Sequence, residues 1–299
     1  GDTISPILFT STLRSVFKTL NWDDKGIEIN DRKLNNLQFA DDIVLFSSTR
    51  YELELMAKEL EVASLKVGLE INASKTVMMN SEGDQSSIRL SAGNVDLVNN
   101  FVYLGHCVSI PYEPTTEIKR RIKCAWGSFA KHSKFLRARH VHMKHKRKLF
   151  NMVTFPSFVY ASETWALHKG DRKSLAVAQR KMERRMAGFT LLERKSNEWL
   201  RNVTKVDDVN VVAAKRKWNW ALKVSSYPIE RWPRQVCEWV PTGTRPAHRP
   251  KRRWRDDITK QFGPQWMDVA RDVLDGRTYD LRNTWKNGFL LHIETILNE

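Results

Sequence analysis

Two adjacent aspartates between two short apolar runs constrain the N-terminal part of this chain more than any other feature. The apolar runs are residues 37–40 and 43–46, and Asp41 and Asp42 lie between them. Short apolar runs around a polar step predict a β-hairpin with both carboxylates at or near its turn. Because adjacent carboxylates repel each other, such a pair indicates either a divalent metal site or an exposed turn. The pair alone leaves both interpretations open.

The pattern of residues 1–111 is that of a mixed α/β region. Apolar residues recur at helical spacing over 6–20, and a Thr-x-x-Glu capping box at 49–52 begins a second helix that ends near Gly68. Short strands are also expected at 26–30, 69–72, 76–79, 88–90 and 101–110.

The chain after Pro111 is expected to be mainly helical and strongly basic. Residues 1–111 hold 10 Lys/Arg and 15 Asp/Glu, a net charge of -5, whereas residues 112–299 hold 40 and 19, a net charge of +21. Ten of the 11 tryptophans lie in this second part. A basic, aromatic-rich region favours a polyanionic partner, and a merely solvated basic surface is the alternative. Helices are expected at 116–139, 143–168, 171–188, 207–224, 254–262 and 279–297, with irregular chain at 227–253, which contains five prolines.

Other whole-chain features narrow the class of protein. The 299 residues are 41% hydrophobic, so a folded protein with two domains or more is expected. Apolar stretches stay well short of the roughly 18 residues of a membrane span, so no membrane partner is expected. The three widely spaced cysteines favour reduced thiols in an intracellular protein. The chain starts with Gly and shows no secretory leader, and we expect the natural N-terminus to lie upstream.

Four segments resemble the palm motifs of the reverse transcriptases of non-LTR (LINE-type) retrotransposons. In the order of the family, residues 1–9 are similar to its second motif, 39–42 to its third, 68–76 to its fourth and 101–105 to its fifth. The resemblance is close as far as about residue 110, and it is looser after that.

The resemblance implies an α+β fold in three parts. Residues 1–111 would form a partial polymerase palm, an antiparallel sheet with helices. Residues 112–190 would form a helical, thumb-like region, and residues 191–299 a basic, Trp-rich, mostly helical C-terminal domain.

The resemblance also implies roles for single residues. Asp41 and Asp42 would be catalytic acids that hold Mg²⁺, and Lys75 would approach the triphosphate of the dNTP. Tyr103 and Gly105 would belong to the hairpin that grips the primer end. A solvated lysine is the alternative for Lys75, and a core strand is the alternative for Tyr103. The site for the template and the incoming nucleotide would be lined by Gly1, Ser5, Pro6, Phe39 and Ala40.

Two basic clusters are expected to contact the nucleic-acid backbone. The first cluster contributes Lys131, Arg137, Arg139, Lys146 and Arg147, and the second contributes Lys251, Arg252 and Arg253. The second cluster also has the composition of a nuclear-localisation signal, so a nuclear location is expected. The histidines at 140, 142 and 145 lack the spacing of a common zinc site. Trp218, Trp220, Trp232, Trp239 and Trp254 are candidates for stacking on bases, with core packing as the alternative.

The family's first palm motif, which carries another metal-binding aspartate, precedes the second motif and is not within this sequence. We therefore expect the chain alone to bind Mg²⁺ poorly and not to polymerise. The intact enzyme would be an RNA-directed DNA polymerase that takes an RNA template, a DNA primer and dNTPs. The alternative is a non-catalytic, basic nucleic-acid-binding protein derived from a retrotransposon. The sequence gives no indication of the oligomeric state.

Overall fold

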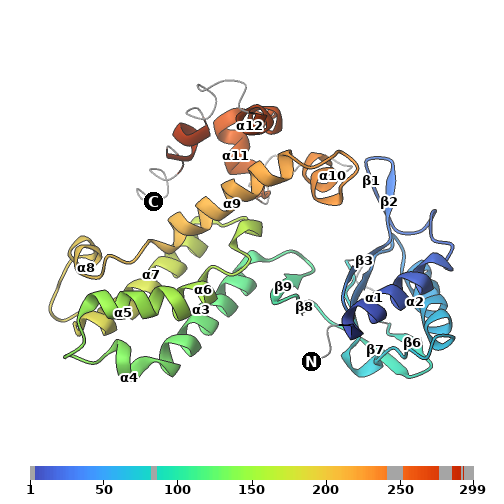
Figure 1. The fold of residues 1–299 in the computed structure, drawn as a ribbon, viewed down its shortest axis with the longest axis horizontal. Coiled ribbons are helices and arrows are strands. Elements are labelled where there is room, and N and C mark those ends of the chain that lie inside the picture. The colour runs from blue at the N-terminus through green and yellow to red at the C-terminus, as the bar shows by residue number, and fades with distance from the viewer. Residues whose placement is uncertain (1–3, 82–85, 241–251, 276–284, 291, 293–299) are drawn as a thin grey trace. The chain divides into compact units, whose positions relative to one another are not determined.

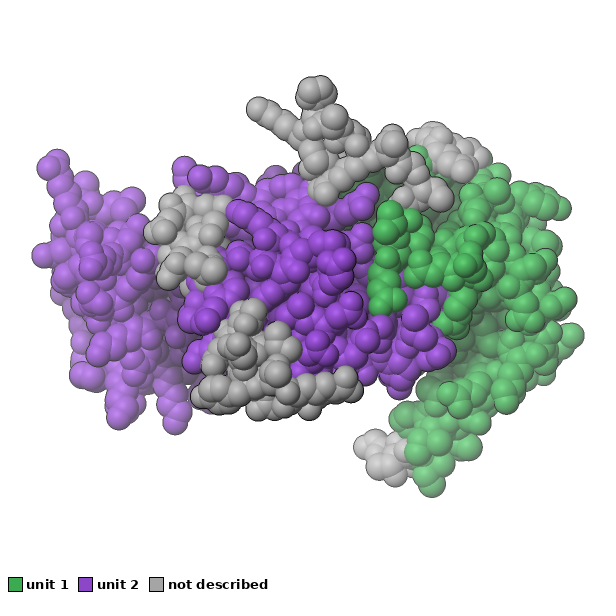
Figure 2. Space-filling view, turned by 90° about the horizontal axis from the view of Figure 1, so that it is seen from above, with its two compact units in different colours: residues 1–103, 108–112, 238–240 green, residues 104–107, 113–237, 241–299 purple. Residues whose placement is uncertain are grey.

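A computed structural model of the chain describes residues 4–81, 86–240, 252–275, 285–290 and 292, and its ribbon is drawn in Figure 1. The chain contains both helices and short strands, which agrees with the predicted α+β class. The chain divides into two compact units, which Figure 2 colours separately. Unit 1 comprises residues 1–103, 108–112 and 238–240, and unit 2 comprises residues 104–107, 113–237 and 241–299. Among the described residues, no helix has the length and apolar character needed to cross a membrane.

Two helices of unit 1 pack against each other. Helix α1 (Ser5–Lys18) carries Pro6 in its first turn, where the missing N–H costs nothing. Helix α2 (Arg50–Leu65) begins after Thr49, whose hydroxyl accepts a hydrogen bond from the backbone N–H of Glu52 at 3.2 Å. Both predicted helices are therefore present. Apolar side chains of both helices pack together with Trp22, which follows α1, and the buried members of this core are Val16, Trp22, Met56, Leu60 and Ala63.

The strands of unit 1 form small sheets. Strands β1 (Ile27–Ile29) and β2 (Arg32–Leu34) pair antiparallel, as do β3 (Asn36–Phe39) and β4 (Asp42–Leu45). A three-stranded sheet has the order β5 (Val77–Met78), β7 (Gly93–Leu97), β6 (Ile88–Leu90), with β5 parallel and β6 antiparallel to β7. Strand β8 (Asn100–Tyr103) pairs with β9 (His106–Ser109).

One predicted strand of unit 1 is wrong. Residues 69–72 do not form a strand, because the Asn72 side chain caps the 3₁₀ turn η1 (Ala73–Lys75) by accepting a hydrogen bond from the backbone N–H of Lys75. A local side-chain bond of this kind competes with sheet pairing.

The first core of unit 2 is built from helices. Its largest buried members include Phe129, Phe150, Phe158, Leu175 and Met182. The elements of this part are α3 (Pro114–Lys131), α4 (Ser133–Leu136), α5 (Met143–Leu149), the π-helix η2 (Phe150–Thr154), α6 (Phe155–Phe158), the 3₁₀ helix η3 (Ser162–Thr164), α7 (Lys169–Ala187), α8 (Asn197–Thr204) and α9 (Val209–Ser225).

The continuous helix predicted over residues 143–168 is wrong. Pro156 has no backbone N–H to donate to residue 152, so the helix widens into η2 before it, and α6 ends at Phe158. Ala161 then adopts a left-handed conformation with φ of 56° and begins a new turn. The result is a bent segment whose Trp165 still reaches the core.

A second core of unit 2 packs around the C-terminal half of α9. Trp218 is 1% exposed and contacts the rings of Phe262, Trp285 and Phe289 edge-on. Helices α10 (Trp232–Glu238), α11 (Asp256–Phe262) and α12 (Trp266–Asp275) lie in this part, and residues 285–290 are helical. The prediction of irregular chain at 227–253 is wrong where α10 forms. Residues 241–251 of this predicted irregular segment lie outside the described part of the chain.

Candidate functional site

The acidic pair lies at the tip of the β3–β4 hairpin. Phe39 pairs with Asp42 across the hairpin, so Ala40 and Asp41 are the two residues of its turn. Ala40 has a φ of 53°, and a positive φ at this place is what two-residue hairpin turns require. Ala40, Asp41 and Asp42 are all exposed, so both carboxylates are open to a ligand.

The hairpin tip and the first turns of α1 meet in a pocket of about 350 Å³. Its lining residues are Ser5, Pro6, Phe9, Thr10, Ala40 and Asp41. Two segments separated by about 30 residues of sequence therefore meet in a pocket that Asp41 helps to line. Phe39 is 62% exposed and precedes the turn directly. Gly1, the remaining predicted member of this site, lies outside the described residues.

Of the other predicted site residues, Tyr103 of the predicted primer grip lies near Asp42. Burial raises the pKa of the Tyr103 phenol above its ordinary value, and the negative charge of Asp42 raises it further. Lys75 is exposed at the end of η1, where its backbone N–H donates to the Asn72 side chain. Within the described part of the chain, its ammonium group makes no hydrogen bond or ion pair with either aspartate. The structure thus places Tyr103 within electrostatic reach of Asp42.

The acidic pair is not a complete metal site. The described residues contain no group of three or more His, Cys, Asp or Glu side chains that could hold a metal ion. Mg²⁺ takes hard oxygen ligands in near-octahedral geometry, and two-metal sites need carboxylates from more than one segment. Asp41 and Asp42 offer carboxylates from one turn only, so the residues present do not fit a Mg²⁺ centre by themselves.

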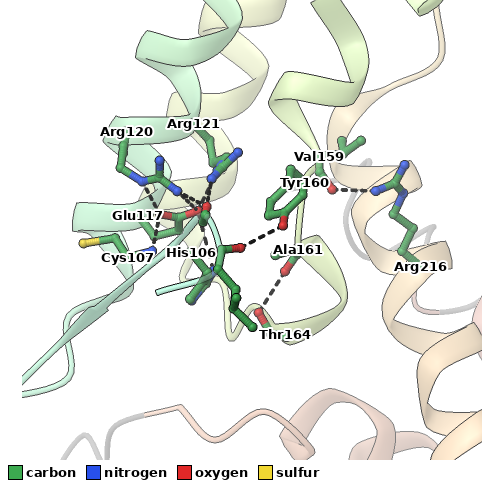
Figure 3. Close-up of polar contacts among 12 residues, drawn as sticks. His106, Cys107, Glu117, Arg120, Arg121, Val159, Tyr160, Ala161, Thr164 and Arg216 are labelled. Carbon is green, nitrogen blue, oxygen red and sulfur yellow. Dashed lines mark hydrogen bonds and ion pairs between the residues drawn. The ribbon is translucent and has the colours of Figure 1, made fainter. Parts of the chain in front are cut away.

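Three side chains that Figure 3 labels, Tyr160, Arg120 and Arg121, hold the turn at Leu104 and Gly105. Both residues have positive φ, 46° and 74°. The Tyr160 hydroxyl donates to the Leu104 carbonyl at 2.8 Å, and the guanidinium groups of Arg120 and Arg121 both donate to the Gly105 carbonyl. A Cβ added to Gly105 would lie 3.3 Å from the Tyr160 ring. Glycine at this place therefore provides both the backbone conformation and the space.

Glu117 stands at the centre of this cluster, as Figure 3 shows. It is 3% exposed, and it accepts hydrogen bonds from the Cys107 backbone N–H at 2.9 Å, from Arg120 Nε at 2.8 Å and from Arg121 Nε at 2.6 Å. Burial alone would raise the pKa of Glu117, but these hydrogen bonds outweigh it and lower the pKa. The carboxylate is therefore ionised in the folded protein at neutral pH.

The sequence did not predict this cluster. Glu117, Arg120 and Arg121 stand at i, i+3 and i+4 of one helix, a spacing that predicts ion pairs along the helix. That spacing does not indicate that these three side chains lie beside the turn at Leu104 and Gly105. The turn comes close to α3 only in the tertiary fold.

The first basic cluster is divided between surface and interior. Lys146 is 5% exposed, and its ammonium group donates to the Met186 carbonyl at the end of α7 at 2.8 Å. Burial lowers the pKa of Lys146. Lys146 therefore serves the interior of unit 2 and departs from its predicted role at the surface. The other predicted members are exposed or half-buried: Lys131, Arg137, Arg139 and Arg147.

The second basic cluster is only partly described. Lys251 lies outside the described residues, and Arg253 is half-buried. Arg252 lies 3.8 Å from the Asp257 carboxylate, which itself accepts a hydrogen bond from Lys217 at 2.7 Å.

Two tryptophans proposed for base stacking are held inside unit 2. Trp218 is a core residue, and the Trp254 indole N–H donates to the Glu163 carbonyl at 2.6 Å. The histidines of the first cluster also have a local use, because His142 accepts a hydrogen bond from the Lys144 N–H at the start of α5.

Comparison with known proteins identifies the N-terminal part of the chain. Residues 1–108 match the family of reverse transcriptases, RNA-dependent DNA polymerases. The matched residues contain the α1 pocket, the acidic hairpin and the Leu104–Gly105 turn. The resemblance of this part of the chain to reverse transcriptases is thus confirmed.

Relatives extend the match. A transposon-derived protein of Caenorhabditis elegans is 30% identical over 277 residues, which are 86% of this chain and 99% of that protein. The Pol polyprotein of the type-2 retrotransposable element R2DM of Drosophila melanogaster is 38% identical over 84 residues, 28% of this chain. The Pol polyprotein of the type-1 element R2 of Nasonia vitripennis is 30% identical over 110 residues, 36% of this chain. The matches cover only 8% and 11% of the two polyproteins. By these similarities, the chain belongs to the reverse transcriptase family of non-LTR retrotransposons.

Proposed function

We propose that this chain contributes part of the catalytic palm to an RNA-directed DNA polymerase of a non-LTR retrotransposon. The observation that carries the proposal is the pocket in which Ser5 and Pro6 of α1 meet Ala40 and Asp41 of the hairpin tip. A polymerase needs an acid at the place where the incoming nucleotide and the primer end meet. Residues 1–111 then act as palm, 112–190 as thumb and 191–299 as a basic C-terminal domain.

In this proposal the chain's own residues position substrates. Ser5, Pro6, Phe39 and Ala40 shape the place of template and incoming dNTP. The turn at Tyr103 to Gly105 lies against the primer end, and Lys75 approaches the triphosphate once substrate is bound. Asp41 and Asp42 would be two of the Mg²⁺ ligands of the intact enzyme, and the metal would supply positive charge there for an attacking hydroxyl and for the phosphates.

Because the acidic pair is not a complete metal site, this chain alone is expected to be inactive. Purified chain should give no detectable Mg²⁺-dependent extension of a DNA primer on an RNA template. Clear dNTP incorporation by the purified chain would contradict this expectation.

Complementation tests the polymerase assignment itself. The chain is co-expressed with any segment that its gene is found to encode immediately upstream, and primer extension is measured again. Activity should appear, and Asp41→Asn should abolish it. The exposed pair Asp23 and Asp24 offers a matched control, so Asp23→Asn should leave activity unchanged. Activity that survives Asp41→Asn, or equal losses in both variants, would rule out the acidic hairpin as the site.

A second candidate is a non-catalytic nucleic-acid-binding protein derived from a retrotransposon. The net charge of +21 over residues 112–299 supports it, as does the similarity to a transposon-derived protein over 99% of that protein's own length. The gene separates the two candidates. An upstream segment of the type Phe-x-Asp-x-x-x-Ala-Phe-Asp supports the polymerase, and a start codon at that place supports the binding protein. The basic residues 245–253 lead us to propose a nuclear location in both cases.

A further inference from the structure

Two guanidinium groups share one buried carboxylate beside the Leu104–Gly105 turn. Arg120 and Arg121 both donate to Glu117 and to the Gly105 carbonyl. A single carboxylate neutralises one of them, so the group keeps a net positive charge. We propose that Arg120 is a binding site for a backbone phosphate of nucleic acid and that Glu117 holds it in place.

The two arginines differ in exposure. The Arg121 side chain is 7% exposed, and its guanidinium lies 4.7 Å from the centre of the Tyr160 ring, so it is enclosed. The Arg120 side chain is 26% exposed. Arg120 donates hydrogen bonds through Nε and Nη2, and Nη1 donates none to any of the described residues. A guanidinium group has five N–H donors, so Arg120 keeps donors for a phosphate oxygen.

Glu117 removes part of the cost of binding at Arg120. An arginine on a free surface must lose side-chain freedom when it binds a phosphate. The two bonds from Arg120 to the Glu117 carboxylate, at 2.8 and 3.2 Å, already fix the orientation of the guanidinium plane. The bond to the Gly105 carbonyl fixes it further.

The ligand is a polyanion because the positive charge continues along α3. Lys119 and Lys123 are exposed beside Arg120, and Lys123 lies on the same helical face at i+3. A phosphodiester chain presents one negative charge per nucleotide, so successive phosphates can meet successive cations. The proposal depends on the nucleic-acid binding in the proposed function, and it does not depend on polymerase activity.

The salt dependence of binding tests the proposal. The full chain is titrated against a fluorescein-labelled DNA duplex at several salt concentrations, and the logarithm of the affinity is plotted against the logarithm of the salt concentration. Arg120→Gln should reduce the magnitude of the slope by about 0.9, the value for one phosphate contact with duplex DNA. The control Arg14→Gln removes an exposed guanidinium of α1 and should leave the slope unchanged. An Arg120→Gln slope equal to that of the wild type overturns the proposal.

Glu117→Gln tests the positioning role, because two explanations predict opposite changes in the affinity for DNA. If only net charge mattered, loss of an acid would tighten binding to a polyanion. If Glu117 positions Arg120, the folded variant should bind more weakly and with a smaller slope. Glu198→Gln removes an exposed acid of α8 and should bind as tightly as the wild type or more tightly. Tighter binding by folded Glu117→Gln overturns the positioning role.

The melting temperature of each variant shows whether it is folded. If Glu117→Gln does not fold, the salt dependence of DNA binding by Arg120→Gln alone decides whether Arg120 binds a phosphate. Complete absence of binding by the wild-type chain at low salt would overturn the nucleic-acid binding in the proposed function together with this site. Normal binding with an unchanged Arg120→Gln slope overturns the phosphate site alone.

Discussion

His292 predicts that acid destabilises the second core of unit 2. Its side chain is 5% exposed, its ring stacks on Trp218 with centroids 5.7 Å apart, and Nε2 lies 3.6 Å from the Asp257 carboxylate. Burial lowers the pKa of His292 from 6.5 to about 4. The positive charges of Arg172, Lys217 and Arg252 lower it further, and Asp257 opposes them. The folded protein therefore holds a neutral imidazole at pH 7.

The pKa difference sets the size and the pH range of the effect. Above pH 6.5 the imidazole is neutral in both the folded and the unfolded chain, so its contribution to stability is fully present. Below pH 6.5 the unfolded chain binds a proton that the folded chain does not bind, so the free energy of unfolding falls until about pH 4. A shift of about 2.5 pKa units corresponds to a total of about 3 kcal/mol, of which about 2 kcal/mol is lost by pH 5.

Urea denaturation followed by tryptophan fluorescence at pH 7.5 and pH 5 measures this loss. Wild-type chain and the exposed-histidine control His140→Gln should both lose about 2 kcal/mol more on acidification than His292→Gln, whose amide does not titrate. The difference between the variants isolates His292 from other titrating groups. The same pH dependence in all three proteins would refute the reasoning.

Two further predictions concern a helix cap and a buried lysine. Thr49→Ala should lower the free energy of unfolding by about 1 kcal/mol, because the hydroxyl that accepts a hydrogen bond from the Glu52 N–H is lost. Urea denaturation at pH 7.5 measures this free energy, and an unchanged value would contradict the cap. Lys146→Met should leave the salt dependence of DNA binding unchanged, whereas Lys131→Met should reduce the magnitude of the slope by about 0.9, since Lys146 bonds the Met186 carbonyl and Lys131 is exposed. A smaller slope for Lys146→Met would show that its ammonium reaches a phosphate.

The parts of the fold that follow from adjacent residues were predictable. The capping box at 49–52 marks the start of α2, and the apolar runs around the acidic pair mark β3 and β4. In each case the deciding bonds join residues only a few positions apart, so the pattern in the sequence contains both partners.

Short helices were harder to predict because packing, more than local pattern, stabilises them. Helix α10 contains Pro233 and lies among other prolines, yet it buries Gln235 at 7% exposure, and the Gln235 side chain donates to the Ile229 carbonyl at 2.5 Å. Helix α12 was not predicted, although Trp266 and Ala270 on one of its faces enter the core around Trp218. The partners of these faces come from distant segments.

The candidate site shows the same division. The hairpin that carries Asp41 was predictable from its own residues. The hairpin tip meets the first turns of α1 only because α1 packs against α2. The periodicity of the sequence did not predict this contact, whereas the resemblance in four motifs indicated it. Glu117 is the extreme case, because its i+3 and i+4 partners are local and its Cys107 partner is not.

Lys146 shows why a count of positive charges overestimates contacts with phosphate. Its position in the sequence is three residues after Met143 and four before Phe150, and both of these side chains pack in or against the first core of unit 2. Helical spacing therefore places Lys146 on the apolar face of α5, and it is buried, while Lys144 and Lys148 on the other faces are exposed. The same argument applied to α3 leaves Arg120 at the edge between the buried and the exposed face, next to the enclosed Arg121. Position on the helix, more than charge, decides which cations of this chain can meet a nucleic-acid backbone.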